Sequence, residues 1–247
     1  MDRALYIGMT GASATLKAQE AVSHNLANVG TVGFKAELLK QEAAQVQGPG
    51  FETRFNALVA DGGFDASSGP LQTTGNDLDI ALADDRWLAV QDPQGNEAYT
   101  RAGDLQLTPL GQLVTRGGLP VLGENGPVAI PPHQKLTIGA DGTLSIVPQG
   151  QGPETLAQIG RLKIVTGTGD DLARGLDGLF RAADPQAPPA PAAGNVLVSG
   201  ALEGSNVNAA EALVQMISLS RQFEMQVKVL RTADENARAA STLLRMS

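Results

Sequence analysis

Three pairs of nearby carboxylates are the side chains of this sequence best suited to cation binding or acid–base catalysis. Each pair lies in or beside a predicted turn, where aspartate is favoured because its side chain hydrogen-bonds to the local backbone. We therefore interpret the pairs as solvated turn residues, and predict neither a catalytic nor a metal site at them. The pairs are Asp77 with Asp79, Asp84 with Asp85, and Asp170 with Asp171.

The remaining residues and motifs also give little support for a reaction centre. His24 and His133 are the two histidines, and the 247 residues contain no cysteine, which excludes a disulfide framework, a thiol nucleophile and a Cys-built metal site. The sequence has no Gly-Lys-Ser/Thr phosphate loop, no Rossmann glycine fingerprint and no Gly-x-Ser-x-Gly nucleophile elbow. We predict that the chain is not an enzyme and that it binds no cofactor.

The net charge and the hydropathy of the chain limit the classes of partner that it is expected to bind. The 18 basic and 26 acidic residues give a net charge of −8, which disfavours binding to nucleic acid. No run of about 18 apolar residues is present, so we expect no membrane insertion. Residues 1–5 are not a basic region that leads into an apolar core, and we therefore expect no cleaved secretory signal.

The elements that organise the chain are two predicted terminal helices. In the C-terminal helix, large apolar residues recur every seven positions, and a partial second column precedes them by three positions. This spacing is typical of helices that pack along a narrow seam. Asn208 followed by Glu211 matches a capping box and predicts where the helix begins. The predicted seam consists of Met216, Phe223, Leu230, Ala237 and Leu244, with Leu213 and Val227 in the second column.

Residues 3–28 predict a second helix, with apolar residues at three- to four-residue spacing. Gly8 and Gly11 weaken it by about 1 kcal/mol each relative to alanine, so this helix needs a packing partner. The C-terminal seam also needs to be covered, and we therefore expect the two ends of the chain to pair. The apolar face consists of Leu5, Met9, Ala12, Leu16, Val22 and Leu26.

Between the helices the pattern changes to short strands separated by turns. Residues 87–91 and 97–101 flank a Pro/Gly turn, and residues 136–138 and 143–147 flank Gly139-Ala140-Asp141-Gly142, a strong hairpin signal. Residues 36–46 are interpreted as briefly helical, and the glycine- and proline-rich stretch that follows as irregular.

These patterns predict an α+β fold: an antiparallel all-β central domain with long N- and C-terminal helices that pair into a coiled-coil-like layer. The predicted organisation is a helix and motif at 1–35, an extended or irregular linker at 36–70, the antiparallel β-domain at 71–183, a Pro/Ala-rich return linker at 184–205 and the C-terminal helix at 206–247.

Motifs at both ends of the chain resemble those of the bacterial flagellar rod and hook axial proteins. The middle, at 87–90, 99–101 and 111–115, also resembles the β-domain of that family, so the resemblance covers nearly the whole chain. Within the family, the Met1-Asp2-Arg3 opening and residues 221–225 favour a proximal-rod protein. The motif residues are Asn25, Leu26, Ala27, Asn28, Thr31, Gly33 and Phe34 near the start, and Ser205, Asn206, Val207 and Asn208 near the end.

The resemblance implies a structural subunit of the proximal rod, which self-assembles through its terminal helices into the axial drive shaft and transmits torque. The two apolar seams described above are then the assembly interface. The implied partners are copies of the same chain, other proximal and distal rod proteins, and the flagellar type III export apparatus. That apparatus is expected to deliver the chain to the periplasm-spanning rod without cleaving a signal.

Two alternatives remain open from the sequence. One is a distal rod protein of the same family. The other belongs to a different class: a cell-wall carbohydrate-binding or hydrolytic β-domain with helical tethers. Hydrolysis would require carboxylates that converge in a cleft from distant segments, whereas the four aspartates at residues 77–85 crowd a single segment.

Overall fold

The computed structural model describes residues 2–45, 55–150 and 155–245. Two compact units are present. The first, here called the helical unit, comprises Met1–Ala27, Glu37–Gly63 and Asn208–Ser247. The second, here called the β-unit, comprises Asn28–Ala36 and Phe64–Val207. Each unit is therefore built from segments that are far apart in the sequence.

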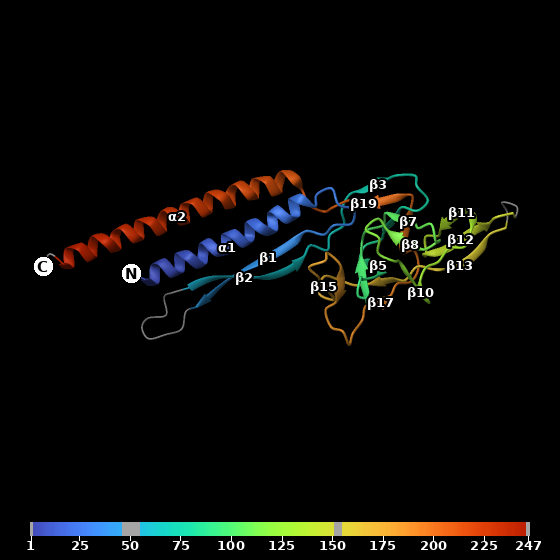
Figure 1. Cartoon of the computed structure of the whole chain (residues 1–247), viewed down its shortest axis with the longest axis horizontal. Coiled ribbons are helices and arrows are strands. Elements are labelled where there is room, and N and C mark those ends of the chain that lie inside the picture. The colour runs from blue at the N-terminus through green and yellow to red at the C-terminus, as the bar shows by residue number, and fades with distance from the viewer. Residues whose placement is uncertain (1, 46–54, 151–154, 246–247) are drawn as a thin grey trace. The chain divides into compact units, whose positions relative to one another are not determined.

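Two long helices and a strand pair form the helical unit (Figure 1). The helices α1 (Asp2–Ala27) and α2 (Ala209–Arg245) lie close to their predicted ranges. Asn208 caps α2, because its Oδ1 accepts hydrogen bonds from the backbone nitrogens of Ala210 at 3.0 Å and Glu211 at 3.4 Å. The asparagine half of the predicted capping box is thereby confirmed.

The strand pair of the helical unit corrects the sequence prediction for residues 37–45 and 55–64, whereas residues 65–70 are irregular as predicted and residues 46–54 lie outside the described structure. Strand β1 (Glu37–Gln45) pairs with β2 (Phe55–Phe64), where the sequence predicted a short helix followed by an irregular linker. Alanine, leucine, glutamate and glutamine in β1 favour helix locally. The strand forms because β1 packs on α1 and pairs with β2, contacts that a local pattern does not report.

The β-unit is antiparallel, as predicted. Its largest sheet has the order β15-β16-β6-β5-β14-β17, and a second sheet has the order β11-β12-β13. The predicted hairpin at Gly139-Ala140-Asp141-Gly142 joins β11 to β12, with Ile138 opposite Leu144. The strands of the two sheets are β5 (Arg86–Gln91), β6 (Glu97–Thr100), β11 (His133–Ile138), β12 (Thr143–Pro148), β13 (Ala157–Arg161), β14 (Ile164–Thr166), β15 (Leu172–Arg174), β16 (Phe180–Ala182) and β17 (Ala190–Pro191).

The remaining strands of the β-unit form two-stranded pairs, and they show that residues 184–205 are more than a linker. Three strands lie in that range, and two of them pair with strands near the start of the β-unit, over 100 residues earlier in the chain. The pairs are β3 (Leu71–Thr73) with β19 (Ala201–Glu203), β4 (Ile80–Leu82) with β18 (Leu197–Ser199), β7 (Leu105–Leu107) with β8 (Leu113–Thr115), and β9 (Leu122–Gly123) with β10 (Gly126–Pro127).

The core of the β-unit is fully buried. Leu88, Val90 and Leu113 expose none of their surface. A second cluster surrounds Trp87, whose ring centroid lies 5.6 Å from that of Phe64 in an edge-to-face arrangement. Because the strands bring these side chains together from all parts of the unit, the β-unit has its own hydrophobic core, and the α+β class is confirmed.

Candidate assembly interface

The face of α1 that packs on α2 carries polar side chains with partners across the seam. The Thr15 hydroxyl lies 3.2 Å from Gln226 Oε1, and Gln19 Nε2 lies 3.4 Å from Ser220 Oγ. Residue numbers rise along α1 while they fall along α2, so the two helices pack antiparallel, as they run in Figure 1.

A glycine makes room for the largest aliphatic residue of this seam. A Cβ atom placed on Gly8 would lie 2.6 Å from Leu230 Cδ2. Leu230 therefore occupies the space that any other residue at position 8 would fill. The glycine that weakens α1 as an isolated helix thus allows α1 and α2 to approach closely.

The predicted seam residues of α2 lie as follows. Leu213 is 49% exposed. The side chains of Ala237 and Leu244 lie outside the described part of the structure. The others are half-buried along the side of α2 that carries Ser220 and Gln226, namely Met216, Phe223, Val227 and Leu230.

The predicted face of α1 is only partly the face that packs. Ala12 is buried, and Val22 and Leu26 are half-buried, whereas Met9 is 60% and Leu16 is 43% exposed. The side chain of Leu5 lies outside the described part. The sequence interpretation gave most weight to large apolar residues, but close helix packing here uses Gly8 and the polar side chains.

Both helices also carry exposed apolar residues that face away from the seam. At 100° per residue, four exposed apolar residues of α2 lie on the side opposite Phe223 and Leu230. On α1, Tyr6 is 56% exposed and shares the open side with Met9 and Leu16. The sequence interpretation missed the second face of α2, although its three- to four-residue spacing was readable. The exposed residues of α2 are Val214, Ile217, Met225 and Val229, at 54–67%.

The two family-like motifs meet inside the β-unit, around one buried carboxylate. Glu203 Oε1 accepts a hydrogen bond from Lys35 Nζ at 2.9 Å, and Glu203 Oε2 accepts one from Arg101 Nε at 2.7 Å. The three side chains expose at most 2% of their surface. Gly69 N also donates to Glu203 Oε1, at 3.0 Å. The cluster joins the N-terminal motif, the end of β6 and the C-terminal motif.

The electrostatics of this cluster are unbalanced, since two cations share one carboxylate. Burial, and then the positive charge of Arg101, lower the pKa of Lys35 below its ordinary value, while Glu203 opposes that shift. Backbone carbonyl oxygens also offset the excess positive charge of the cluster. Lys35 Nζ donates to Ser67 O at 2.6 Å, and Arg101 donates to Arg86 O at 2.9 Å. The cations are therefore held by both the carboxylate and the backbone.

Asn206 of the C-terminal motif ties together the same chain segments. Its Oδ1 accepts a hydrogen bond from Ala36 N at 2.7 Å, and its Nδ2 donates to Asp65 O at 2.9 Å. Its backbone nitrogen donates to Phe34 O at 3.3 Å. Gly33 has a positive φ of 66°, and a Cβ on it would lie 2.3 Å from the Arg101 carbonyl carbon. This position thus requires glycine.

The other motif residues have structural contacts. Asn25 brackets the start of β1, because its amide accepts from Glu37 N at 2.8 Å and donates to Glu37 O at 2.9 Å. Thr31 Oγ1 donates to Asn28 Oδ1 at 3.1 Å, and Ser205 Oγ accepts from Val207 N at 3.2 Å. Phe34 and Ser205 are buried, Leu26 and Val207 are half-buried, and Ala27 is exposed.

The aspartate pairs lie in turns or at a bridge. Asp79 is 9% exposed and accepts hydrogen bonds from Thr74 at 2.6 Å and Asn76 at 2.9 Å. Asp171 accepts from the backbone nitrogen of Thr168 at 2.9 Å, which lowers its pKa. Among the described residues no group of three or more His, Asp or Glu side chains could hold a metal ion.

The histidines have local contacts. His24 Nδ1 lies 3.1 Å from Glu37 Oε2, and His133 Nδ1 lies 2.9 Å from the carbonyl oxygen of Pro131. Of the helices in the described ranges, neither has a stretch that is both long and apolar enough to span a bilayer.

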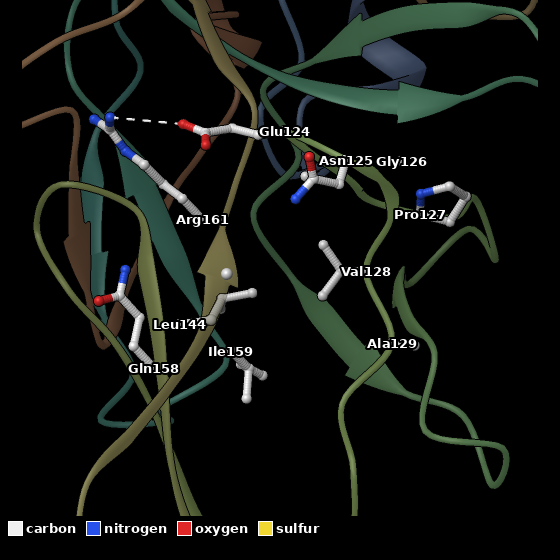
Figure 2. A pocket seen from close by; sticks show the side chains of 12 residues that line it. Glu124, Asn125, Gly126, Pro127, Val128, Ala129, Leu144, Gln158, Ile159 and Arg161 are labelled. Atoms are coloured by element: carbon white, nitrogen blue, oxygen red, sulfur yellow. Dashed lines mark ion pairs between the residues drawn. The ribbon is translucent and has the colours of Figure 1, made fainter.

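A cleft of about 380 Å³ lies in the β-unit between the β9–β10 hairpin and β13 (Figure 2). Glu124 and Arg161 point towards each other across its rim, with 3.9 Å between their charged atoms. Glu124 is the single carboxylate among the described residues that line the cleft. Because two carboxylates are needed for the usual glycoside hydrolysis, this cleft does not support the hydrolytic alternative.

The chain combines paired terminal helices that carry exposed apolar residues with an antiparallel β-unit, the organisation that the sequence resemblance led us to expect of a rod or hook axial protein. Three family models match the chain. "Flagella basal body rod protein" matches residues 5–35 and "Flagellar hook protein FlgE/F/G D1 domain" residues 81–146. "Flagellar basal body rod FlgEFG protein C-terminal" matches residues 198–243.

Relatives match over the full length. The flagellar basal-body rod protein FlgF of Escherichia coli is 46% identical, and that of Salmonella typhimurium is 44% identical, with 100% of both chains covered in each case. A FlgG rod protein of Buchnera aphidicola is 33% identical over 98% of this chain and 100% of its own. The chain therefore belongs to the FlgF family of flagellar basal-body rod proteins. Its role is that of a structural subunit of the basal-body rod, as the sequence predicted.

Proposed function

We propose that the chain is a subunit of the proximal rod, that it self-assembles through the exposed faces of α1 and α2, and that it transmits torque without catalysing a reaction. The observation that carries this proposal is the pair of apolar stripes on the open sides of the two helices. Met225 and Val229 are 62% and 65% exposed on α2, and Met9 is 60% exposed on α1. Such residues are costly to leave in water.

Burial in an assembly would make these residues stabilising. Covering a large apolar side chain contributes about 1.5–3 kcal/mol. A side chain that stays largely exposed in a single copy gains only a part of this free energy. If the stripe of α1 packs on the stripe of α2 in the next copy, the contact is heterologous. Contacts of this kind build a ring where the rotation between copies closes and a helical array where it does not, and we propose the helical array. The seven-residue column of Met216, Phe223 and Leu230, which lies in the seam with α1, supports a coiled-coil-like pairing of α1 and α2 within each copy.

The proposed domain organisation follows from this role. The predicted segments 1–35 and 206–247, whose helical parts are α1 and α2, would supply the assembling layer, and the β-unit would supply no helix to it. The proposed partners are copies of this chain and other rod proteins, with delivery by the flagellar type III export apparatus. The 46% identity to a FlgF protein, against 33% to a FlgG protein, supports the proximal rather than the distal part of the rod.

The test places charge on the outer stripe of α2. In cells that lack the native gene, Met225→Asp combined with Val229→Asp should abolish swarming in soft agar and remove the chain from purified basal bodies. The matched control is Arg231→Asp, which lowers the net charge by the same two units at an exposed position about 120–160° around α2 from the stripe pair, and it should retain most of the swarm diameter. Circular dichroism of the purified chains should be alike. Normal swarming and rod incorporation of the stripe variant would overturn the proposal.

A further inference from the structure

The apolar seam between α1 and α2 does not by itself determine how the helices align. Met216, Phe223 and Leu230 repeat every seven residues, and all three are half-buried. Sliding α2 by seven residues along α1 therefore replaces one large apolar side chain by another. A repeat of this kind leaves several registers close in free energy, unless some position distinguishes them.

Two polar contacts in the seam do distinguish the registers. Thr15 is 3% exposed, and its hydroxyl contacts Gln226. After a seven-residue shift, Thr15 would face Leu219 or Ala233. The Thr15 hydroxyl also lies 3.1 Å from Gly11 O within its own helix. The Gln226 amide, which is half-buried, would in contrast lose its partner across the seam, and a polar group that is partly removed from water and has no partner is unfavourable.

The second contact behaves in the same way. Gln19 lies one turn further along α1, with its amide nitrogen 3.4 Å from Ser220 Oγ. The same shift would place Leu213 or Val227 opposite Gln19, and neither side chain has a hydrogen-bonding group. The notch at Gly8 adds a steric preference, because it would receive the ring of Phe223 in place of Leu230 in one shifted register.

We propose that the Thr15–Gln226 and Gln19–Ser220 contacts set the register in which α1 and α2 pair, and so fix how far the outer stripes of the two helices are offset along the helix axes. This inference concerns the helices of one copy and does not depend on the rod function. It assigns a specificity role to four residues of the seam, whereas the apolar residues beside them supply attraction without alignment. Single polar residues in helix seams commonly act in this way.

Disulfide trapping tests the register in the full chain, which has no native cysteine to interfere. Gly8→Cys with Leu230→Cys reports the observed register. Gly8→Cys with Phe223→Cys reports a register shifted by seven residues, because these positions otherwise lie about 10.5 Å apart along the axis, too far for a disulfide. This chain also carries Leu230→Ala, since a Cβ on Gly8 would lie 2.6 Å from Leu230 Cδ2 in the observed register. In the otherwise native chain, the shifted pair should crosslink at most one-tenth as much as the native-register pair.

Replacing the polar contacts should remove this preference. With Thr15→Val, Gln226→Met, Gln19→Met and Ser220→Ala together, the shifted pair should crosslink within about threefold of the native-register pair. The matched control makes similar exchanges at exposed positions of α2 and should leave the ratio unchanged: Thr232→Val, Gln222→Met, Gln215→Met and Ser218→Ala. If the fourfold variant loses helical circular dichroism, the Thr15→Val, Gln226→Met double variant is measured instead.

Two results would overturn the proposal. One is an unchanged crosslinking ratio in a helical variant that lacks the polar contacts. The other is a failure of the native-register pair to crosslink in the otherwise native chain. Neither result depends on swarming or on rod incorporation, so failure of this inference is distinguishable from failure of the proposed assembly surface.

Discussion

The two units of this chain treat apolar side chains in opposite ways. In the β-unit, Leu88, Val90 and Leu113 are completely buried by strands of the same unit. In the helical unit, Met225 and Val229 are largely exposed on α2, and the seam residues are only half-buried. The β-unit is therefore built to be stable in one copy, whereas the stability of the helical unit depends on what covers it.

The largest expected effect in this comparison comes from the buried charges of the β-unit. Glu203→Gln leaves Lys35 and Arg101 without their carboxylate in a buried site. We expect a loss of about 3–5 kcal/mol in the free energy of unfolding of the β-unit. Urea unfolding followed by the fluorescence of Trp87, the one tryptophan in the sequence, measures it.

The control for that experiment is Glu97→Gln, which removes a carboxylate from the half-exposed pair with Lys163. An exposed pair contributes about 1 kcal/mol or less. Equal losses in the two variants would mean that the buried cluster has no special importance for the β-unit.

The next effect concerns the apolar core. Leu88→Ala should cost about 2–5 kcal/mol, because it leaves a cavity in a core that cannot collapse fully. The substitution should move the tryptophan transition to lower urea by more than it moves the transition of the helical circular dichroism. A single transition, with both signals coincident in native and variant chains, would contradict the separation of the chain into two units.

A smaller effect depends on pH. Arg181 binds Asp177 at 2.7 Å and Asp92 at 3.0 Å, and its hydrogen bonds lower the pKa of both carboxyls. A lowered folded-state pKa gives stability that is present above the unfolded-state pKa and is lost as pH falls through the folded-state pKa. Arg181→Gln should therefore reduce the urea midpoint at pH 7 and change it less at pH 2. An equal reduction at both pH values would refute this account.

The smallest expected effect on stability concerns the outer stripe of α2 in the helical unit. Val229→Ser on the outer stripe of α2 should change the free energy of unfolding of a dilute single copy by no more than about 0.5 kcal/mol. Sedimentation velocity of the same sample is the check that the chain is monomeric at this concentration. A loss above about 1 kcal/mol would mean that Val229 is covered within its own chain, so that the stripe is not available to a neighbour.

The sequence was sufficient to predict the two terminal helices, the antiparallel β-domain and the hairpins β5–β6 and β11–β12, because their signals are local. Asn208 marks the start of α2 through its own side chain, and glycine and aspartate mark the turn between β11 and β12. The pairing of β3 with β19 and of β4 with β18 was not predicted. Those strands are three residues long, and they are specified by partners over 100 residues away.

The candidate interface was predicted in part for the same reason. The seven-residue column of α2 was found because large apolar residues at fixed spacing are visible in one segment. The predicted packing face of α1 differs from the observed one, because Gly8 and Thr15 pack on α2 while Met9 and Leu16 remain exposed. Which side of a helix is covered depends on the shape of its partner, and this information is not contained in the hydrophobicity of either helix alone. The residue-level role of the predicted seam in assembly stays a prediction.

The buried cluster of Lys35, Glu203 and Asn206 has a mechanical consequence. Residues 33–36 and 203–206 leave the β-unit side by side, joined by hydrogen bonds such as that from Gly33 N to Glu203 O at 2.8 Å. A pull on both ends of the β-unit therefore strains this latch before it reaches any strand of the two larger sheets. The β-unit is in this way protected from being peeled open strand by strand when load passes through the chain ends.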